Sequence, residues 1–519
     1  MKKILSYVLC LAMILASLTG CASVDARTTV QQKQVESAKK ISTELASKIE
    51  MNKKPKYIFM FIGDGMSYAQ INSAQVYEGN NTYGEVAPEM LNFTQFPVAG
   101  VITTQDSTSF CPDSASTATS LASGVKTHSG TIGLEVDKKT VAPTIAELLK
   151  AQKNMKVGIV SNVTINHATP AAYYSHIVSR NDYYDIAMQM ADSEFDYFGG
   201  GSISKATGSN KDKESAYEVL KKKGYKVADT KDEILSLNKN SGKVYAVSPV
   251  LQDSGAMPYA IDAKEGDLQL ADFVKKGIDV LDNENGFFLM TESGKIDWAA
   301  HANDAKSVIS DVLAFEDAIQ AAIDFGKKHP SETLIIVTAD HETGGMTIGY
   351  AATGYDTAFN ILENQKISYV AFDELMKDMK AQDADGLTFG EVMPVITENF
   401  GLVAPNGIDE KAAGLKVNPL EMTDGEYKKL QDGFNESMKK DKVKTDEAYL
   451  LYGGYDPLSV SITHIVNNKA GIGWTSYSHT GVPVGVFATG VGADIFNGSY
   501  DNTDVFDKLV ELTKIKIGK

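Results

Sequence analysis

One apolar stretch that ends in a carboxylate decides the fold: Tyr57-Ile-Phe-Met-Phe-Ile-Gly-Asp64-Gly-Met66. An apolar run of this length without polar alternation predicts a strand that is covered on both faces. Asp64 stands between two glycines at the end of that strand. A carboxylate in such a place suits a hard cation, because the flanking backbone can come close to it. An ordinary polar turn is the alternative, and this stretch alone does not decide between the two.

Working outward, four further apolar runs predict buried strands: Val157 to Val160, Phe287 to Met290, Leu334 to Val337 and Val484 to Phe487. Helical patterns lie between them, among them Val141 to Lys150, Asp267 to Leu281 and Lys306 to Phe325. Strands that alternate with helices predict an α/β sandwich with a largely parallel sheet. In such sheets the ligand site lies beyond the carboxyl ends of the strands, so we expect the functional residues directly after the strands.

Composition and charge narrow the class of protein. The chain has 519 residues, of which 43% are hydrophobic and 23% are charged, as in ordinary globular enzymes. It has 67 acidic and 50 basic residues, which give a formal net charge of −17. That excess argues against nucleic acid as a specific partner, because binding a phosphate backbone needs a basic face. Only two residues, Arg27 and Arg180, are arginines, so Arg180 is the one planar guanidinium in the body of the chain.

The N-terminus has the pattern of an export signal. Two lysines precede an apolar run from Ile4 to Leu18, which ends in Leu18-Thr-Gly-Cys21 and resembles a bacterial lipobox. We expect residues 1–20 to be a lipoprotein signal peptide and residues 21–54 to be a tether lipidated at Cys21. The protein would then be anchored to a membrane by lipid, on the periplasmic side or at the cell surface. An ordinary signal peptide with a chance cysteine is the alternative.

The region from 350 to 470 differs from the rest. It lacks strong buried-strand runs and carries charged helical stretches such as Asp424 to Lys442. We therefore expect a mainly helical insertion at 350–470, within an α/β core formed by residues 55–349 and 471–519.

The remaining polar motifs stand beside predicted strands or at the start of a helix. Asp113-Ser114 opens a helix of small residues, where free N–H groups and the helix dipole favour an anion. Asp297 and His301 are four residues apart, so a helix would place both on one face, where they could share a zinc ion. The others are Glu292, Asp340-His341, His479-Thr-Gly and His167-Ala-Thr169, which is followed by Arg180. Each motif alone also fits a helix cap, a surface contact or a polar turn.

Taken together and in this order, the motifs resemble those of the alkaline phosphatase family. The resemblance runs from about Lys56 to the C-terminus and includes Asp501-Asn-Thr-Asp504, while the insertion matches least well. It implies a three-layer α/β sandwich with a central mixed, mostly parallel sheet of about ten strands flanked by helices. It also implies a homodimer and a crown-like place for the insertion.

The resemblance assigns roles residue by residue. Ser114 matches the nucleophile that becomes phosphoserine, Arg180 the group that grips phosphate, and Asp113 the carboxylate that orients Arg180. Two Zn²⁺ ions and one Mg²⁺ ion per subunit are implied, with these protein ligands: Asp297, His301 and His479; Asp340, His341 and Asp64; Asp64, Thr169 and Glu292. His167 and Trp298 would stand beside the magnesium site, and His128 lies in a loop that can approach the site without an assigned role.

The implied activity is the metal-dependent hydrolysis of phosphate monoesters with an alkaline pH optimum, as in phosphate scavenging. Phosphate esters hydrolyse extremely slowly without a catalyst, and metal ions can both activate a serine and take the charge of the leaving oxygen. One alternative is a phosphodiesterase of the same superfamily, although such enzymes usually replace the arginine that Arg180 matches. The other is a lipid-anchored phosphate-binding protein without turnover, which would need neither Ser114 nor six zinc ligands.

Overall fold

The computed structural model describes residues 54–518, except for 83–84, 383–385, 408–417 and 440–444. The expected signal peptide at 1–20 and all of the expected tether except its last residue lie outside the described residues. No helix among the described residues is long and apolar enough to cross a membrane.

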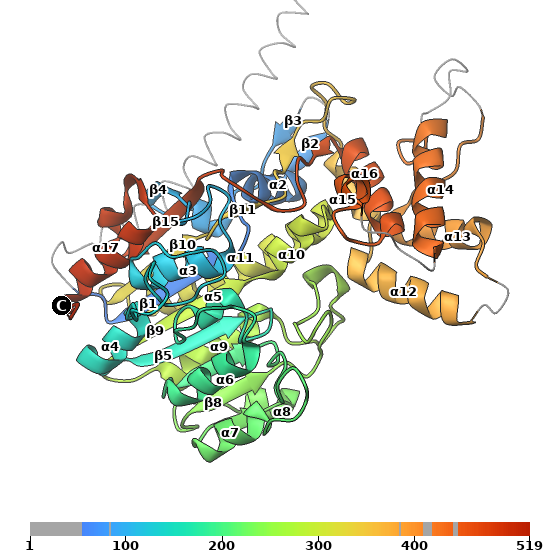
Figure 1. Ribbon diagram of the computed structural model, residues 1–519. Helices are drawn as coiled ribbons and strands as arrows, with labels where there is room; N and C mark the ends of the chain where they lie inside the picture. Colours follow the sequence, from blue (N-terminus) through green and yellow to red (C-terminus); the bar gives the residue numbers. More distant parts are fainter. Residues whose placement is uncertain (1–53, 83–84, 383–385, 408–417, 440–444, 519) are drawn as a thin grey trace, which may run out of the picture.

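A ten-stranded sheet forms the centre of the molecule (Figure 1). From one edge to the other its strands are β16 (Gly498–Asp501), β4 (Val98–Thr103), β15 (Val484–Gly490), β10 (Thr333–Thr338), β1 (Tyr57–Gly63), β9 (Phe287–Ser293), β5 (Lys156–Ser161), β6 (Tyr197–Gly200), β8 (Val244–Val247) and β7 (Lys226–Ala228). Only β15 runs antiparallel to its neighbours, β10 and β4; all other neighbouring pairs are parallel. This confirms the predicted mixed, mostly parallel sheet.

All five strands predicted from apolar runs are present: β1, β5, β9, β10 and β15. The other five were not predicted. Of these, β7 has three residues and β6, β8 and β16 have four each, too few for a clear apolar run. Three small two-stranded sheets add β2 (Asn80–Thr82) with β3 (Glu85–Ala87), β11 (Glu342–Thr343) with β14 (His479–Thr480), and β12 (Thr347–Ile348) with β13 (Ile472–Gly473).

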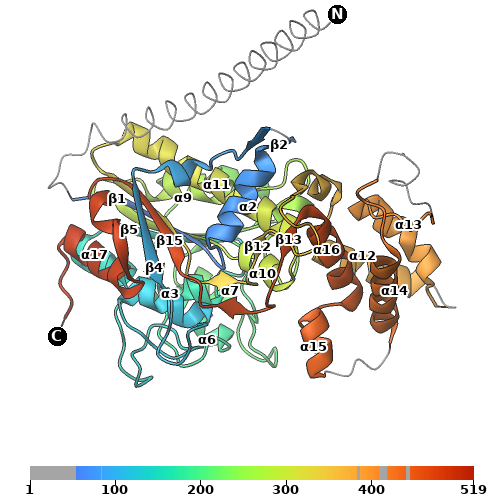
Figure 2. The same cartoon turned by 90° about the horizontal axis from the view of Figure 1, so that it is seen from above.

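Helices cover both faces of the sheet (Figures 1 and 2). One group packs on strands from β10 to β6 and includes α9 (Leu270–Leu281) and α11 (Ala305–Lys328), with α2 (Tyr68–Glu78) against α11. The other group comprises α3 (Ser114–Ser123), α4 (Ile145–Lys153), α5 (Ala168–Ala171) and α17 (Thr503–Thr513). Further helices complete the core: α6 (Tyr183–Asp192), α7 (Ala216–Lys222), α8 (Lys231–Leu235) and α10 (Lys295–His301), with 3-10 turns η1 (Asn92–Gln95), η2 (Ala260–Asp262) and η4 (Ala493–Phe496).

Two predicted helices begin later than expected, and side-chain caps explain why. The helix expected from Val141 begins at Ile145, because Thr144 and Glu147 form a capping box directly after Pro143. The helix expected from Asp267 begins at Leu270, because Gln269 and Asp272 cap it in the same way.

The described residues between 350 and 470 are helical and contribute no strand to the large sheet. They form η3 (Phe359–Asn364), α12 (Tyr369–Gln382), α13 (Phe389–Phe400), α14 (Asp424–Met438), α15 (Asp446–Tyr452) and α16 (Pro457–Ala470). These helices gather at one side of the sandwich (Figures 1 and 2). Helix α14 ends at Met438, and the predicted end at Lys442 lies outside the described residues.

A buried carboxylate joins this helical segment to the core. Asp304 caps α11 by accepting hydrogen bonds from the Ser307 amide and hydroxyl. It also accepts from the Gln365 side chain at 2.8 Å and from the Tyr369 amide at 3.0 Å. Because one carboxylate serves both parts, the start of α12 is fixed relative to the loop that leads from α10 into α11.

We predict that Asp304→Ala lowers the free energy of unfolding by about 2–4 kcal/mol, since a helix cap and two further charged hydrogen bonds are lost. Urea denaturation measures this value. Asp324→Ala on the exposed face of the same helix is the control and should change it by less than about 0.5 kcal/mol. Equal losses in the two variants would contradict the role given to Asp304.

Candidate active site

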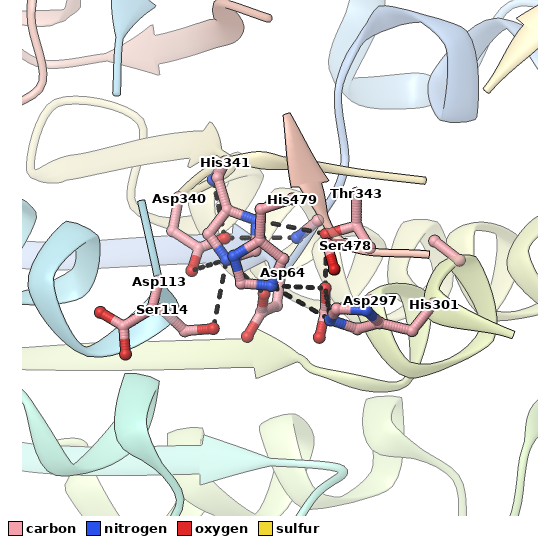
Figure 3. A network of polar contacts seen from close by, with 12 residues as sticks. Asp64, Asp113, Ser114, Asp297, His301, Asp340, His341, Thr343, Ser478 and His479 are labelled. Atoms are coloured by element: carbon pink, nitrogen blue, oxygen red, sulfur yellow. Dashed lines mark hydrogen bonds and ion pairs between the residues drawn. The ribbon is translucent and has the colours of Figure 1, made fainter. Parts of the chain in front are cut away.

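The polar motifs meet at the carboxyl ends of β1, β9 and β10. Ile62 of β1 lies level with Glu292 of β9 and with Thr338 of β10, so the residues that follow these strands share one edge of the sheet. Asp64 follows β1 there, and Asp340 follows β10. Asp297 comes from α10, which begins directly after β9. Figure 3 shows the carboxylates and histidines converging in front of Ser114.

The glycine after Asp64 permits this close approach. Gly65 has a φ of +72°, and a Cβ atom there would lie 2.9 Å from Asp297 Cα. Its amide also donates to Asp340 Oδ1 at 3.3 Å. A larger residue would therefore be strained and would push the β1 loop away from α10.

Asp297, His301 and His479 form the first cluster of candidate metal ligands, with their ligand atoms within 4.8 Å of one another. The Nδ1 atom of each histidine lies 2.6 Å from a backbone carbonyl, that of Tyr477 for His301 and that of Pro112 for His479. Each Nδ1 therefore donates its proton, which leaves the Nε2 lone pair free to bind a cation. The two Nε2 atoms face each other at 3.1 Å, an arrangement that a shared cation stabilises.

Asp64, Asp340 and His341 form the second cluster, and all three are buried. His341 Nε2 lies 3.4 Å from Asp64 Oδ1 and 3.3 Å from Asp340 Oδ2. Burial raises the pKa of Asp340 to about 8, with the nearby Asp297 carboxylate adding to the effect. Burial, followed by repulsion from Asp340 and Asp297, also raises the pKa of Asp64. These carboxylates are thus crowded by one another and short of positive charge.

Ser114 stands at the first turn of α3, where the Asp113 side chain caps the helix by accepting from the Ser116 amide at 3.1 Å. The Ser114 hydroxyl lies 3.1 Å from His341 Nε2 and so points at the second cluster. The helix dipole and the free amides of the first turn favour negative charge at this position.

Arg180 lies beside the serine and is held by the same cap residue. Its Nη1 donates to Asp113 Oδ2 at 3.0 Å, and its Nη2 is 3.4 Å from His167 Nε2. Burial works against the Asp113 charge, but Arg180 and several hydrogen bonds keep the pKa of this carboxyl below its usual range. The guanidinium is therefore oriented by a charged partner at the edge of the cavity.

A third set of oxygen atoms lies behind Asp64. Thr169 Oγ1 donates to Asp64 Oδ2 at 3.2 Å, and Ser161 donates to Glu292 Oε2. Asp64 Oδ1, Glu292 Oε1 and His167 Nδ1 are buried and have no hydrogen-bond partner among the described residues. Burial raises the pKa of Glu292 to about 7. His167 packs edge-on against Trp298, with the ring centres 5.6 Å apart.

The donor chemistry of these sets fits metal ions. Each of the first two clusters offers imidazole nitrogen and carboxylate oxygen from three side chains, as catalytic zinc sites do. The third set offers only oxygen atoms from Asp64, Thr169 and Glu292, which suits Mg²⁺. Asp64 Oδ1 and Glu292 Oε1, which are buried and accept no hydrogen bond from the described residues, fit the same conclusion, because a buried charge needs compensation.

His128, which had no assigned role, contacts the backbone of its own loop: its Nε2 lies 3.1 Å from the Val136 carbonyl. The loop does approach the site, but through Gly130, whose carbonyl accepts from the Arg180 amide at 2.8 Å. His464 is another histidine without an assigned role; its Nε2 lies 3.1 Å from Asn303 Oδ1, and its ring stacks on Tyr477.

Several residues that support the site were missed at the sequence level. Thr343 donates to Asp297 Oδ1 at 2.5 Å and pairs with His479 in the small β11–β14 sheet, which fixes where that histidine stands. Thr117 donates to Asp340 Oδ2 at 3.3 Å. Thr343 follows the Asp340-His341 motif closely, so its position in the sequence could have indicated a supporting role. Thr117 lies in a helix of small residues, where nothing in the sequence indicated one.

A cavity of about 390 Å³ opens in front of the serine. Ser114, Arg180, His167 and ligands of the first cluster line one part of it. Asp253, Ser254, Trp298, Tyr369 and Tyr455 line another, and no motif in the sequence had indicated the two tyrosines. The geometry is that of a phosphate-sized anion site with room for an attached group.

Comparison with known proteins agrees with the family resemblance of the sequence motifs. The family model of alkaline phosphatase matches residues 55–515. The chain is 32% identical to alkaline phosphatase 4 of Bacillus subtilis (strain 168) over 482 residues, which cover 91% of this chain and 92% of that protein. Alkaline phosphatase 3 of the same organism is 31% identical over 460 residues, 87% of each chain.

Solved structures agree in fold. The cold-active alkaline phosphatase of Shewanella sp. matches with a TM-score of 0.69 and 27% identity, covering 88% of this chain and 99% of that one. The Thermus thermophilus alkaline phosphatase, at 24% identity, has the same fold, with a TM-score of 0.71 over 91% of this chain and 94% of that one. The family match over most of the chain, the relatives and the converging site together place this chain in the alkaline phosphatase family, the phosphoric monoester hydrolases.

Proposed function

We propose that this protein hydrolyses phosphate monoesters through a phosphoserine on Ser114, with metal ions held by the clusters around it. The observation that carries the proposal is the position of the Ser114 hydroxyl, 3.1 Å from His341 Nε2 within the second cluster and at the start of a helix. A serine hydroxyl is a weak nucleophile unless a neighbouring group activates it. Metal ions held by the clusters beside Ser114 would provide that activation.

The proposed metal content is two Zn²⁺ ions and one Mg²⁺ ion per subunit. Zinc ions would be held by Asp297, His301 and His479, and by Asp64, Asp340 and His341; magnesium would be held by Asp64, Thr169 and Glu292. When bound, such ions lower the pKa of a nearby hydroxyl and stabilise the charge that develops on the leaving oxygen.

The chain's own residues account for the remaining steps. Ser114 Oγ forms a bond to phosphorus while the bond from phosphorus to the ester oxygen breaks and the alcohol leaves. Water then attacks the phosphoserine, restores the serine hydroxyl and releases phosphate. Arg180 binds phosphate oxygens during both steps, and Asp113 keeps its guanidinium oriented by the 3.0 Å hydrogen bond. We expect the rate to be highest at alkaline pH.

The proposed setting is outside the cytoplasmic membrane, with a lipid on Cys21 and a role in phosphate scavenging. The signal-like N-terminus supports this, and loss of fatty-acid labelling in Cys21→Ser would test it. We also propose a homodimer by analogy with the family, which light scattering would test.

We predict that Ser114→Ala lowers kcat for p-nitrophenyl phosphate by about 10³-fold or more, because the covalent route is lost. Ser107→Ala, an exposed serine in the preceding loop, is the control and should retain wild-type activity. The wild type should prefer this monoester strongly over bis-p-nitrophenyl phosphate. A preference for the diester, or more than a tenth of the activity in Ser114→Ala, would count against the proposal.

We predict that Arg180→Lys raises the inhibition constant of inorganic phosphate by about 10- to 100-fold, because one ammonium cannot replace two parallel guanidinium hydrogen bonds. Competition against p-nitrophenyl phosphate measures this constant. Lys213→Ala, which changes an exposed lysine in the loop between β6 and α7, is the control and should leave the constant unchanged. An unchanged constant in Arg180→Lys would remove Arg180 from the phosphate site.

A further inference from the structure

One wall of the cavity has no part in the steps assigned to Ser114, Arg180 and the metal ligands. Trp298, Tyr369 and Tyr455 form what we call the aromatic wall, and Asp253 stands beside it. Its three rings come from α10, from the start of α12 and from the turn before α16. The wall faces the same cavity as Ser114, so it lies where the alcohol portion of a substrate would extend.

The rings are held in place by well-defined contacts. Tyr369 and Tyr455 pack edge to face, with ring centres 5.6 Å apart and planes at 87°. The Tyr369 hydroxyl is 3.2 Å from that of Tyr259, and its amide is anchored on Asp304. Trp298 contacts His167 and Lys295. The centres of the Trp298 and His167 rings are 5.6 Å apart, and the Lys295 ammonium lies 4.8 Å from the centre of the Trp298 ring. The wall is therefore preorganised.

The charged side chain that lines the cavity beside this wall is the Asp253 carboxylate. Asp253 Oδ2 lies 3.5 Å from the ammonium of Lys295, which is fully buried and also interacts with the Asp311 carboxylate. Among the described residues that line the cavity, Arg180 is the only arginine or lysine, and it is bonded to Asp113 at the phosphate end. A cation at the wall would be attracted, and a second anion would be repelled.

The backbone that presents Asp253 is strained. Asp253 and Ser254 have φ values of 42° and 63°, two consecutive non-glycine residues in the left-handed region. The turn is closed by the Gln252 amide, which donates to the Ala256 carbonyl at 2.8 Å. Non-glycine residues in this region cluster at ligand-binding sites and in tight turns, and aspartate adopts it more readily than most residues.

A cation already sits beside part of these residues. The Lys295 ammonium lies 3.9 Å from the ring centre of Tyr259 and 4.8 Å from that of Trp298, next to Asp253. Aromatic faces combined with a carboxylate are the usual environment for ammonium and quaternary ammonium groups in proteins. The aromatic wall repeats this chemistry on the side that is open to a substrate.

We propose that the aromatic wall and Asp253 bind the ammonium group of amino-alcohol phosphate monoesters such as phosphocholine and phosphoethanolamine. The proposal rests on the phosphatase function and adds a substrate class to it. The phosphate would lie at Ser114 and Arg180, and the ammonium would lie among Trp298, Tyr369 and Tyr455. A leaving group with a second phosphate or a carboxylate would face Asp253 and be disfavoured.

The test compares phosphocholine with 3,3-dimethylbutyl phosphate, which has nearly the same shape without the charge, on the zinc- and magnesium-loaded protein. We expect kcat/KM to favour phosphocholine by about tenfold. Asp253→Asn and Tyr455→Leu should each reduce this preference to about twofold or less. The matched control Asp212→Asn removes an exposed carboxylate that does not line the cavity, and should keep the full preference.

Equal turnover of the two esters by the wild type, or a preference that survives both variants, would overturn the proposal. Hydrolysis of p-nitrophenyl phosphate checks the phosphatase function separately. If that ester is not hydrolysed either, the proposed function fails, and calorimetric binding of the two alkyl phosphates to Ser114→Ala decides the subsite. Tighter binding of phosphocholine supports the aromatic wall, and equal binding rejects it.

Discussion

Repulsion among four buried carboxylates is the constraint on which the rest of the site depends. Asp64, Glu292, Asp297 and Asp340 are all less than 5% exposed, at the ends of β1, β9 and β10. Carboxylates cannot remain ionised together in a buried space unless cations neutralise them. Parallel strands bring them together, since neighbouring parallel strands end at one edge of the sheet. The fold thus gathers carboxylates that need metal ions to balance their charge. The imidazoles of His301, His341 and His479 complete the two sets of candidate ligands.

The surrounding residues orient the candidate ligand side chains and do not neutralise their negative charge. Nδ1 of His301 and His479 is tied to backbone carbonyls, and Thr343 and Thr117 donate to the Asp297 and Asp340 carboxylates. Such outer contacts fix which atom of each ligand faces the centre. Among the described residues that line the cavity, Arg180 is the only arginine or lysine. The phosphate-binding role that we propose for it would account for an arginine here in a chain that has only two.

The sequence was sufficient to predict those strands and ligands that a pattern of neighbouring residues marks. Five buried strands could be predicted from their apolar runs, and the candidate ligands from their place beside those strands and the order of their motifs. The short strands β6, β7, β8 and β16 left no such signal. Asp253, Tyr369 and Tyr455 could not be predicted at all. Asp253 follows β8, Tyr369 begins α12 and Tyr455 precedes α16, so only tertiary packing brings them to one cavity. His128 was expected near the site because its loop does approach, but its ring binds Val136.

We propose that the two carboxylate–histidine clusters hold the catalytic metal ions. Crystals of the zinc-loaded protein, measured at the zinc absorption edge, test it most directly. We expect one anomalous peak at Asp297, His301 and His479 and a second at Asp64, Asp340 and His341, with the second lost in His341→Ala. Peaks confined to surface residues, or a second peak that persists in that variant, would contradict it.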